Sequence, residues 1–343
     1  MRGDAVPGGQ RVLIIGAGAI GGTLGALLSR AGIDVTFLTR TEEAAAEIRG
    51  RGLTVSGVRG TLSAQPRAVA GPASPEGPFH AVLVAVKAYD LAGAVGPLVP
   101  SIPADCPVVS LQNGICLDEL EALVGPHRAV GCVVGWGATL RGAAEMELTS
   151  EGELVIGCRS AAGASRLAAL QELLSLAFPT EVSSDILADL YSKLIINSCI
   201  TTVGALCGQR LGWMLGRRSC RRIFIGIMQE GMVVAHAARL SVPAYAGRLD
   251  YEAFVHGSGP LAVARRHLVL RIMGTKYRRL KSSSLQSLER GRPTEVDSFN
   301  GYIARRARDL GVAAPLNERL VTMVHEIEQG RRAISPANLE GLP

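Results

Sequence analysis

Lysine is rare in this chain, and two of its four lysines lie in apolar stretches. The other 32 of the 36 basic residues are arginines, so a compact, titratable ammonium stands out against guanidinium groups. Lys87 and Lys193 are the two in apolar surroundings, whereas Lys276 and Lys281 lie among arginines. Although the stem of a helical lysine can also carry its charge to water, Lys87 and Lys193 are the first candidates for chemistry.

Lys193, Asn197 and Thr201 follow one another at intervals of four residues in a largely apolar segment. Because that segment has a helical pattern, the spacing places the three polar groups on one face. Such a face marks either a buried network or the wall of a site. An ammonium there can stabilise and protonate the alkoxide that forms when a hydride reaches a carbonyl, so Lys193 is the candidate general acid. In the alternative, Lys193 only caps a helical interface.

A glycine-rich loop joins the predicted strand Arg11–Ile15 to a predicted helix. In this context the backbone amides and the helix N-terminus can meet a pyrophosphate, so the loop predicts dinucleotide binding rather than a purely structural turn. The glycines have the spacing G-x-G-x-x-G, and the candidate cofactor-binding residues are Gly16, Ala17, Gly18, Ala19, Ile20 and Gly21.

The end of the second predicted strand, Asp34–Leu38, indicates which dinucleotide is bound. Arg40 lies where NAD-binding proteins place an acid for the ribose 2′-hydroxyl, and an arginine can pair with a 2′-phosphate instead. NADPH is therefore the expected cofactor. In the alternative, Arg40 is an exposed loop charge and Glu42 or Glu43 takes the acidic role.

Two further loops follow predicted strands that end at Val86 and Leu111. Open α/β sheets bind ligands at the carboxyl ends of their strands, so Lys87 and Asn113 are expected to meet cofactor or substrate. The alternatives are a surface residue at a helix start for Lys87 and a simple turn for Asn113 and Gly114.

A second polar cluster near the C-terminus contains Ser283 and Glu295. Pro293 and Thr294 predict a helix start that projects Glu295 from the first turn, where the helix dipole stabilises a carboxylate. An ordinary capping segment is the alternative. The six histidines share no metal-ligand spacing, so no metal is expected.

The order of predicted elements indicates two domains within the 343 residues. Strands alternate with helices in the first half, which predicts an α/β Rossmann-type N-terminal domain with a mostly parallel sheet over residues 1–182. Residues 183–343 are expected to form an all-α C-terminal domain, with the boundary in a turn near Pro179–Asp185. The expected long helices span residues 186–207, 217–238, 261–280, 295–310 and 316–329.

Charge and composition narrow the class of protein. Residues 1–207 carry 14 basic and 19 acidic side chains, while residues 208–343 carry 22 and 11, so the second part is strongly basic. Its arginine pairs lack interleaved aromatics, which favours solvated helix faces over nucleic-acid binding, with attraction of an anionic ligand as a secondary effect. No membrane partner is expected, and a homodimer is one possible assembly.

The chain start and the cysteines indicate a cytoplasmic protein. Residues 1–10 are polar and rich in glycine and proline, without the apolar core of a signal peptide. The seven cysteines are scattered and include no C-x-x-C pair, so reduced thiols in cores are expected rather than disulfides or a zinc site.

Taken in order, these motifs resemble those of the ketopantoate reductase (2-dehydropantoate 2-reductase) family, from Arg11 to about Gln329. The resemblance implies NADPH-dependent reduction of a 2-oxo acid, most simply ketopantoate on the route to pantothenate and coenzyme A. The matching features are the glycine loop, Arg40, Val-Lys87-Ala, Gln-Asn113-Gly, Lys193-Leu-x-x-Asn197, Ser-Ser283 and Arg-Pro-Thr-Glu295-Val-Asp.

The resemblance also implies roles for single residues. Lys193 is then the proton donor, Asn197 and Ser283 hold the substrate, Asn113 lies between cofactor and substrate, and Glu295 acts near the lysine or the cofactor. By the same resemblance, Lys87 belongs to the cofactor-binding residues.

Two positions depart from the family pattern. Thr201, a substrate-binding candidate, stands where members often carry a second asparagine, and Tyr191 stands where they often carry tryptophan. A hydroxyl keeps an acceptor but removes one donor, so the pocket could select another 2-oxo acid, carbonyl or imine. A specialised reductase of the same fold is therefore the second hypothesis. A non-catalytic NADP-binding sensor is the third, and Lys193 and Glu295 argue against it.

Overall fold

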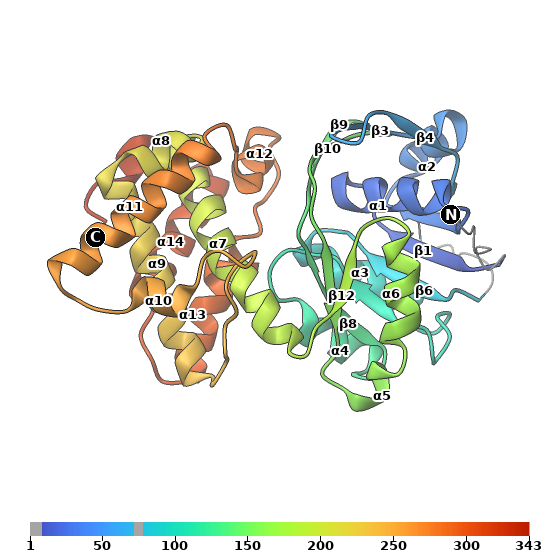
Figure 1. The fold of residues 1–343 in the computed structure, drawn as a ribbon. Coiled ribbons are helices and arrows are strands. Elements are labelled where there is room, and N and C mark those ends of the chain that lie inside the picture. Colours follow the sequence, from blue (N-terminus) through green and yellow to red (C-terminus); the bar gives the residue numbers. More distant parts are fainter. Residues whose placement is uncertain (1–8, 72–77, 343) are drawn as a thin grey trace. The chain divides into compact units, whose positions relative to one another are not determined.

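The computed structural model describes residues 9–71 and 78–342, which divide after Leu187 into two compact units (Figure 1). Unit 1 contains all the named strands, and unit 2 is helical. The predicted fold class, a Rossmann-type α/β domain followed by an all-α domain, is confirmed. The domain bounds 1–182 and 183–343 stay a prediction. Residues 1–8, on which most of the signal-peptide argument rests, lie outside the described residues.

An eight-stranded sheet forms the centre of unit 1, in the order β12-β11-β8-β7-β6-β1-β2-β5. Neighbouring strands are parallel except β8 and β11. The strand order reverses at β1 and β6, where sheets of this kind bind ligands at the carboxyl ends of the strands. The strands are β1 (Arg11–Ile15), β2 (Asp34–Thr39), β5 (Arg67–Ala70), β6 (Ala81–Val84), β7 (Val108–Ser110), β8 (Ala129–Val134), β11 (Leu154–Gly157) and β12 (Thr180–Val182).

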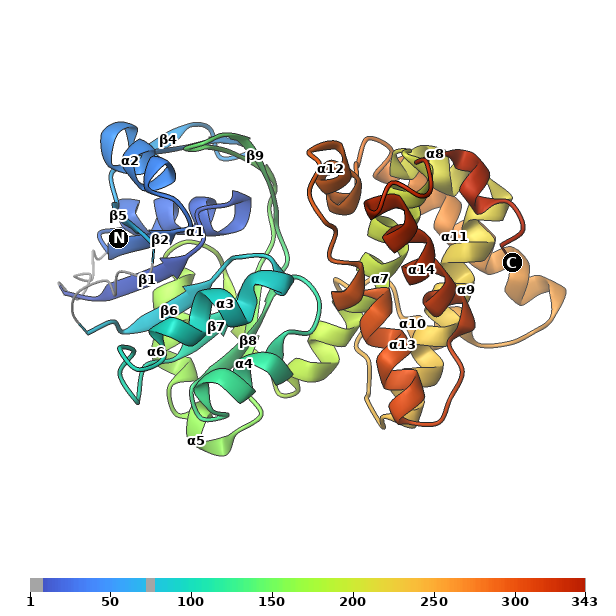
Figure 2. The same cartoon turned by 180° about the vertical axis from the view of Figure 1, so that it is seen from behind.

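Helices cover both faces of this sheet. Figure 1 shows α6 in front of the sheet, and Figure 2, the view from behind, shows α3 and α4 in front of it. The helices of unit 1 are α1 (Ala19–Arg30), α2 (Glu42–Arg51), α3 (Leu91–Val95), α4 (Leu117–Val124), α5 (Ala161–Ala164) and α6 (Leu167–Ser175), with 3₁₀ turns η1 (Ala88–Asp90) and η2 (Gly96–Leu98).

The structure contains a second sheet and a strand β12 that the sequence did not predict. The turn expected across residues 179–185 instead contains β12, because Thr180–Val182 pairs in parallel with β11. The second sheet has the order β4-β3-β10-β9 and pairs segments about 90 residues apart in the chain, which no local pattern reveals. Its strands are β3 (Leu53–Gly57), β4 (Leu62–Ala64), β9 (Gly137–Gly142) and β10 (Glu145–Ser150).

Helix α1 packs on the large sheet with one side and on the small sheet with the other. A Cβ at Gly25 would lie 2.3 Å from Phe37 Cζ and 2.7 Å from Ile14 Cδ1, and one at Gly22 would lie 2.8 Å from Met146 Cε. Close packing on the large sheet therefore requires glycine at position 25, whereas a Cβ at position 22 would displace the flexible Met146 side chain. The packing fixes the N-terminus of α1 relative to β1 and β2.

Unit 2 is built around α7. The hydroxyl of Tyr191 donates to Gly231 O on α9 at 2.9 Å, and the hydroxyl of Tyr251 on α10 donates to Ser192 O at 2.8 Å. The helices are α7 (Ile186–Cys207), α8 (Leu211–Gly216), α9 (Arg218–Ala237), α10 (Tyr251–Val255), α11 (Pro260–Lys276), α12 (Ser283–Glu289), α13 (Asn300–Asp309) and α14 (Pro315–Glu328), with 3₁₀ turns η3 (Val296–Ser298) and η4 (Pro336–Leu339).

Among the described residues, α7 is the one helix long and apolar enough to cross a membrane by length and composition, with a mean hydropathy of 1.3. Its most apolar 18-residue window is 83% buried by protein. That burial is typical of the core helix of a folded domain.

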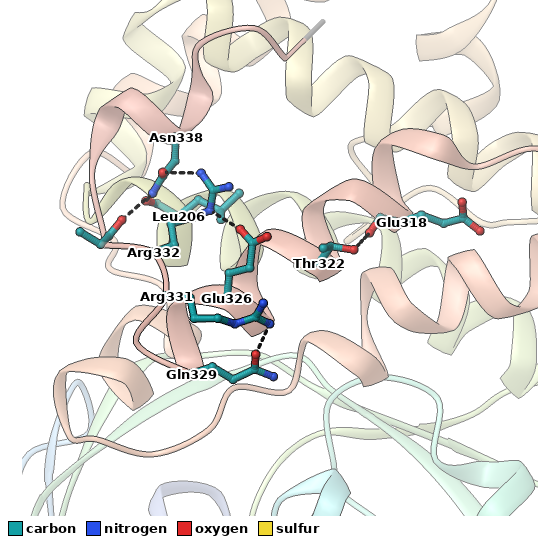
Figure 3. A network of polar contacts seen from close by, with 9 residues as sticks. Leu206, Glu318, Thr322, Glu326, Gln329, Arg331, Arg332 and Asn338 are labelled. Atoms are coloured by element: carbon teal, nitrogen blue, oxygen red, sulfur yellow. Dashed lines mark hydrogen bonds and ion pairs between the residues drawn. The ribbon is translucent and has the colours of Figure 1, made fainter.

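The segment after α14 is hydrogen-bonded to the C-terminal end of α7 (Figure 3). Leu206 O accepts hydrogen bonds from the backbone N–H of Ser335 at 3.0 Å and from Asn338 Nδ2 at 2.9 Å. Arg332 bridges Asn338 Oδ1 at 3.1 Å and Glu326 Oε2 of α14 at 2.7 Å. A carbonyl exposed by the end of α7 is thereby satisfied, and the last turn of the central helix is held in place.

The seven cysteines are free, and six of them are buried. Burial raises the pKa of the Cys106 thiol to about 12 and raises the pKa of Cys199 well above its ordinary value. These thiols are protonated at neutral pH and act as small apolar groups. The expected placement of cysteines in cores is confirmed for six of the seven, and their reduced state stays a prediction.

Candidate active site

The glycine loop connects β1 directly to the N-terminus of α1. Gly16 has a φ of +101°, and a Cβ there would lie 3.0 Å from Val86 N. A Cβ at Gly21 would lie 2.1 Å from Gly16 O, so this glycine allows α1 to approach the loop closely. The first and third glycines thus shape the turn and the packing of strand against helix.

Gly18 has a different reason to be glycine. It is the N-cap of α1, no side chain caps the helix there, and a Cβ would meet no atom within 4 Å. Protein packing therefore does not require a glycine here, and the space that a Cβ would fill is open to a ligand approaching the backbone N–H groups. The first turn of α1 contains no acidic residue, which leaves the positive end of the helix available to a pyrophosphate. The loop fits a dinucleotide.

Arg40 follows β2, is exposed, and forms an ion pair with Asp90 at the end of η1. Thr41 Oγ1 caps α2, and Glu42 pairs with Arg49 of the same helix. Hydrogen bonds from its own backbone N–H and Thr41 lower the pKa of exposed Glu43. The acidic group that contacts Arg40 is therefore Asp90, a residue that sequence reasoning missed.

Lys87 and Asn113 follow β6 and β7 and are both half-buried. Gln112 connects their loops, because its Nε2 donates to Lys87 O at 3.2 Å while its Oε1 accepts from Ser110 Oγ at 3.0 Å. Gly114 has a φ of +87°, which turns the chain back after Asn113. Unit 1 thus presents the glycine loop, Arg40, Lys87 and Asn113 at the carboxyl ends of four adjacent strands.

The predicted polar face of α7 is present in unit 2. Lys193 and Asn197 are half-buried, and Thr201 is buried. The hydroxyl of Thr201 donates to Asn197 O at 2.7 Å, so its hydrogen is used within the helix. Thr201 can offer an approaching ligand only its acceptor lone pairs.

Tyr191, the second departure from the family pattern, anchors α7. Its ring is fully buried, and burial raises the pKa of its hydroxyl far above the ordinary value. Because that hydroxyl donates to Gly231 O, Tyr191 holds α7 against α9 two residues before Lys193.

The sequence predicted Glu295 in the first turn of a long helix, and this prediction is wrong. Glu295 is buried, precedes the 3₁₀ turn η3, and is separated by that turn from α13, which begins at Asn300. The reason is local: Thr294 Oγ1 accepts from Val296 N at 3.2 Å, a turn that competes with helix. Glu328 of α14 accepts from both the N–H and the hydroxyl of Thr294, each at 2.7 Å, and fixes the loop.

Ser283 begins α12 and is half-buried. The preceding Ser282 caps this helix, its hydroxyl accepting from Leu285 N at 3.2 Å. A Cβ at Gly204 of α7 would lie 2.5 Å from Ser282 Oγ, so the start of α12 packs against α7 one turn beyond Thr201.

A buried network joins four helices behind the polar face of α7. Thr202 bonds to Asn300 Oδ1, and Asn300 Nδ2 donates to Asn317 Oδ1 at 2.8 Å. Asn317 Nδ2 donates in turn to Glu230 Oε2 at 2.7 Å. Asn300 and Asn317 are fully buried. The network therefore ties α7 to α13, and through the short loop before α13 it anchors the segment of Glu295.

Comparison with known proteins decides the family. A profile described as "Ketopantoate reductase PanE/ApbA" matches residues 12–161, and "Ketopantoate reductase PanE/ApbA C terminal" matches residues 185–328. This chain belongs to the ketopantoate reductase family. It is similar to a 2-dehydropantoate 2-reductase of Archaeoglobus fulgidus, with 29% identity over 327 residues that cover 94% of this chain and 99% of the relative.

Solved structures agree with this assignment to the ketopantoate reductase family. A PanE/ApbA family ketopantoate reductase from Ralstonia eutropha JMP134 has a TM-score of 0.79 and 28% identity, covering 94% of this chain and all of that one. D-mandelate dehydrogenase with NADH and anilino(oxo)acetate has a TM-score of 0.80 at 21% identity, with the same coverage, and shares the fold. The chain is thus an oxidoreductase of the ketopantoate reductase family.

The candidate residues foreseen from the sequence fall into two groups, one within each unit, and each group is named here as a candidate half-site. The first half-site, in unit 1, comprises the glycine loop, Arg40, Lys87 and Asn113; the second, in unit 2, comprises Lys193, Asn197, Thr201, Ser283 and Glu295. Sequence reasoning missed the residues that position them. Asp90 follows Lys87 by three residues and carries the charge opposite to Arg40, a signal that was available in the sequence. Asn300 and Asn317 gave no signal in the sequence, because their hydrogen-bond partners lie far away in the chain.

Among the described residues, no group of three or more His, Cys, Asp or Glu side chains is arranged to hold a metal ion.

Proposed function

We propose that this protein reduces 2-dehydropantoate to pantoate with NADPH, in the synthesis of pantothenate and coenzyme A. The observation that carries the proposal is the polar face of α7, with Lys193, Asn197 and Thr201, in a chain that both ketopantoate reductase profiles match. The proposed reaction explains why an otherwise apolar core helix carries the ammonium of Lys193 on this face.

The first half-site would hold the dinucleotide. The N–H groups at the start of α1 bind its pyrophosphate beside Gly18, and Arg40 pairs with the 2′-phosphate. Lys87 and Asn113 bind the cofactor from the ends of β6 and β7. When bound, the reduced nicotinamide supplies a hydride to the carbonyl carbon of the substrate.

The second half-site would bind the 2-oxo acid and supply the proton. Lys193 donates a proton to the carbonyl oxygen as negative charge develops there, and its ammonium stabilises that charge before transfer. Asn197 and Ser283 donate hydrogen bonds that orient the substrate, and Asn113 contacts it as well. Glu295, buried and fixed through Thr294, acts near the lysine or the cofactor.

Thr201 fits the hydroxyl group of 2-dehydropantoate. Its own hydrogen is donated to Asn197 O, so the Thr201 oxygen is left as an acceptor for a substrate hydroxyl. Thr201→Val removes this acceptor at nearly constant volume. We expect the KM for 2-dehydropantoate to rise roughly tenfold, the effect of one lost hydrogen bond to a buried partner, while the KM for a 2-oxo acid without a hydroxyl changes little.

The direct test is a panel of 2-oxo acids offered to the purified protein with NADPH, with oxidation followed by the loss of near-ultraviolet absorbance. We expect 2-dehydropantoate to give the highest kcat/KM. Turnover of none of the acids would reject the proposal and favour a non-catalytic NADP-binding sensor.

A second candidate function, a reductase for another carbonyl or an imine, is favoured by the threonine at position 201. Thr201→Asn restores the amide that members of the family often carry there. If another carbonyl compound or imine is preferred at least tenfold by the natural protein, and Thr201→Asn shifts that preference toward 2-dehydropantoate, this second function is the correct one.

We also propose a cytoplasmic location. All seven cysteines are free and six are buried, as is usual where thiols are kept reduced. Detection of the protein in a cell fractionation by antibody would test this, and recovery outside the cytoplasmic fraction would contradict it.

A further inference from the structure

A surface hollow of unit 2, with a volume of about 640 Å³, is lined by cations that the proposed reaction does not use. None of its lining residues is acidic, and none belongs to either half-site. We call it the arginine hollow and define it by Arg218, Arg221, Ser258, Pro260, Val263 and His267.

Arg221 is the buried cation of the arginine hollow. Only 8% of the residue is exposed, and its guanidinium donates from Nη1 to Leu215 O at 2.7 Å and from Nε to His267 Nδ1 at 3.2 Å. Within the part of the chain that the structure describes, no carboxylate forms an ion pair with Arg221 or Arg218. Burial, with repulsion from Arg271 and Arg218, lowers the pKa of Arg221. Such an arrangement is costly unless an anion completes it.

Two helices begin at the arginine hollow and add to its positive potential. Arg218 is the first residue of α9, which has 20 residues, and Pro260 is the first residue of α11, which has 17. Neither helix has a side-chain cap or an acidic residue in its first turn. Cations at the N-terminus of a helix oppose the macrodipole, so this is the reverse of the arrangement that stabilises a helix by itself.

We propose that the arginine hollow binds a phosphate-bearing small molecule. The guanidinium groups of Arg218 and Arg221 pair with phosphate oxygens. His267 accepts from Arg221 at Nδ1, so its Nε2 carries the proton and donates to the anion. Pro260 and Val263 supply an apolar wall for the uncharged part of the ligand.

Phenyl phosphate tests both the cations and the apolar wall of the hollow. Its binding is measured by titration calorimetry on the full chain at constant ionic strength. Saturating NADP⁺ is present, so that phosphate binding at the glycine loop is not counted. We expect one phenyl phosphate per chain, bound at least threefold more tightly than inorganic phosphate, and no binding of phenol. If neither phenyl phosphate nor inorganic phosphate binds, the proposal is wrong.

Single variants assign the binding to this hollow. Arg218 is exposed, so Arg218→Ala is compatible with the fold, and we expect it to weaken phenyl phosphate binding about tenfold through the loss of a charge-assisted hydrogen bond. Arg279→Ala is the matched control, because Arg279 is also exposed and lines a separate hollow with Trp213 and Arg271. We expect no more than a twofold effect there. Equal losses in the two variants would mean general attraction to a basic domain and would refute a specific site.

Discussion

The two half-sites of this ketopantoate reductase family member are built by different means. The first half-site is made largely of backbone: a glycine loop, the N-terminus of α1 and the ends of parallel strands. The second half-site is made of side chains on α7 and on the loops around it, held by hydrogen bonds between distant segments. A backbone site leaves a short motif in the sequence, whereas a side-chain site depends on contacts that the sequence does not display.

This difference also separates binding from chemistry. In the proposed function, residues of unit 1 would face the invariant parts of a dinucleotide, for which local spacing along the chain is enough. Residues of unit 2 would face the substrate, where one hydroxyl in place of an amide changes what is recognised. Substitutions in the glycine loop or at Arg40 should therefore change cofactor affinity, and substitutions at Lys193, Asn197 or Thr201 should change kcat or the KM of the 2-oxo acid.

The largest expected effect is that of Lys193→Ala. Removal of the proposed proton donor should lower kcat by about 10²–10⁴-fold, the usual contribution of general acid catalysis. The dissociation constant of NADPH, measured by fluorescence titration, should stay within twofold. Lys276→Ala, at an exposed position on α11, is the control and should leave both quantities unchanged. An unchanged kcat in Lys193→Ala would end the catalytic assignment.

A pair of glycine substitutions tests whether the first half-site is a backbone site. Gly18→Ala adds a Cβ that meets no protein atom, so the melting temperature should be kept while NADPH binding weakens about tenfold or more. Gly21→Ala places a Cβ 2.1 Å from Gly16 O and should destabilise the fold by about 1–3 kcal/mol. Calorimetric melting and NADPH titration of both variants separate the two effects. Unaltered NADPH binding in Gly18→Ala would show that no ligand approaches this residue.

Much of the fold followed from the sequence because its signals are local. The strand–glycine loop–helix unit and four of the five long helices of unit 2 lie within a few residues of where their periodicity placed them. The fifth, expected to begin at residue 295, begins at Asn300 instead. Its start was missed because Thr294 accepts from Val296 N in a turn, and because Glu328, 34 positions away, accepts from Thr294 and fixes that turn.

The elements that escaped prediction share one property, long sequence separation. Strand β3 pairs with β10, and Thr202 meets Asn300 at a separation of 98 residues. Arg40 was singled out from the sequence, but its ion pair with Asp90, 50 residues away, was not predicted although the sequence showed the opposite charge near Lys87. The candidate residues themselves could be named from type and spacing, whereas the residues that position them could not.

The buried network of unit 2 predicts a loss of stability without a loss of cofactor binding. Asn300→Ala removes the bonds to Thr202 and Asn317, and each polar group left unpaired costs about 1–3 kcal/mol. We expect the free energy of unfolding of unit 2, followed by urea denaturation, to fall by about 3 kcal/mol, and the dissociation constant of NADPH to remain the same. The control Gln329→Ala is exposed and should cost less than about 0.5 kcal/mol. A weakened NADPH affinity in Asn300→Ala would contradict the separation of binding from chemistry.

The smallest expected effect concerns Arg40 and Asp90, an ion pair in the first half-site between side chains 50 residues apart in the chain. If Arg40 binds the 2′-phosphate, Arg40→Ala should reduce the preference for NADPH over NADH about tenfold, because one charge-assisted pair is lost. Asp90→Asn should change the preference in the opposite direction by about twofold to threefold, since it removes a carboxylate that competes with the phosphate for an exposed guanidinium. Arg51→Ala is the control, as Arg51 pairs with Glu47 on the exposed side of α2. The ratio of kcat/KM values for the two cofactors measures all three variants. A lower NADPH preference in Asp90→Asn would mean that Asp90 holds Arg40 in its binding position rather than competing for it, and an unchanged ratio in Arg40→Ala would remove Arg40 from the first half-site.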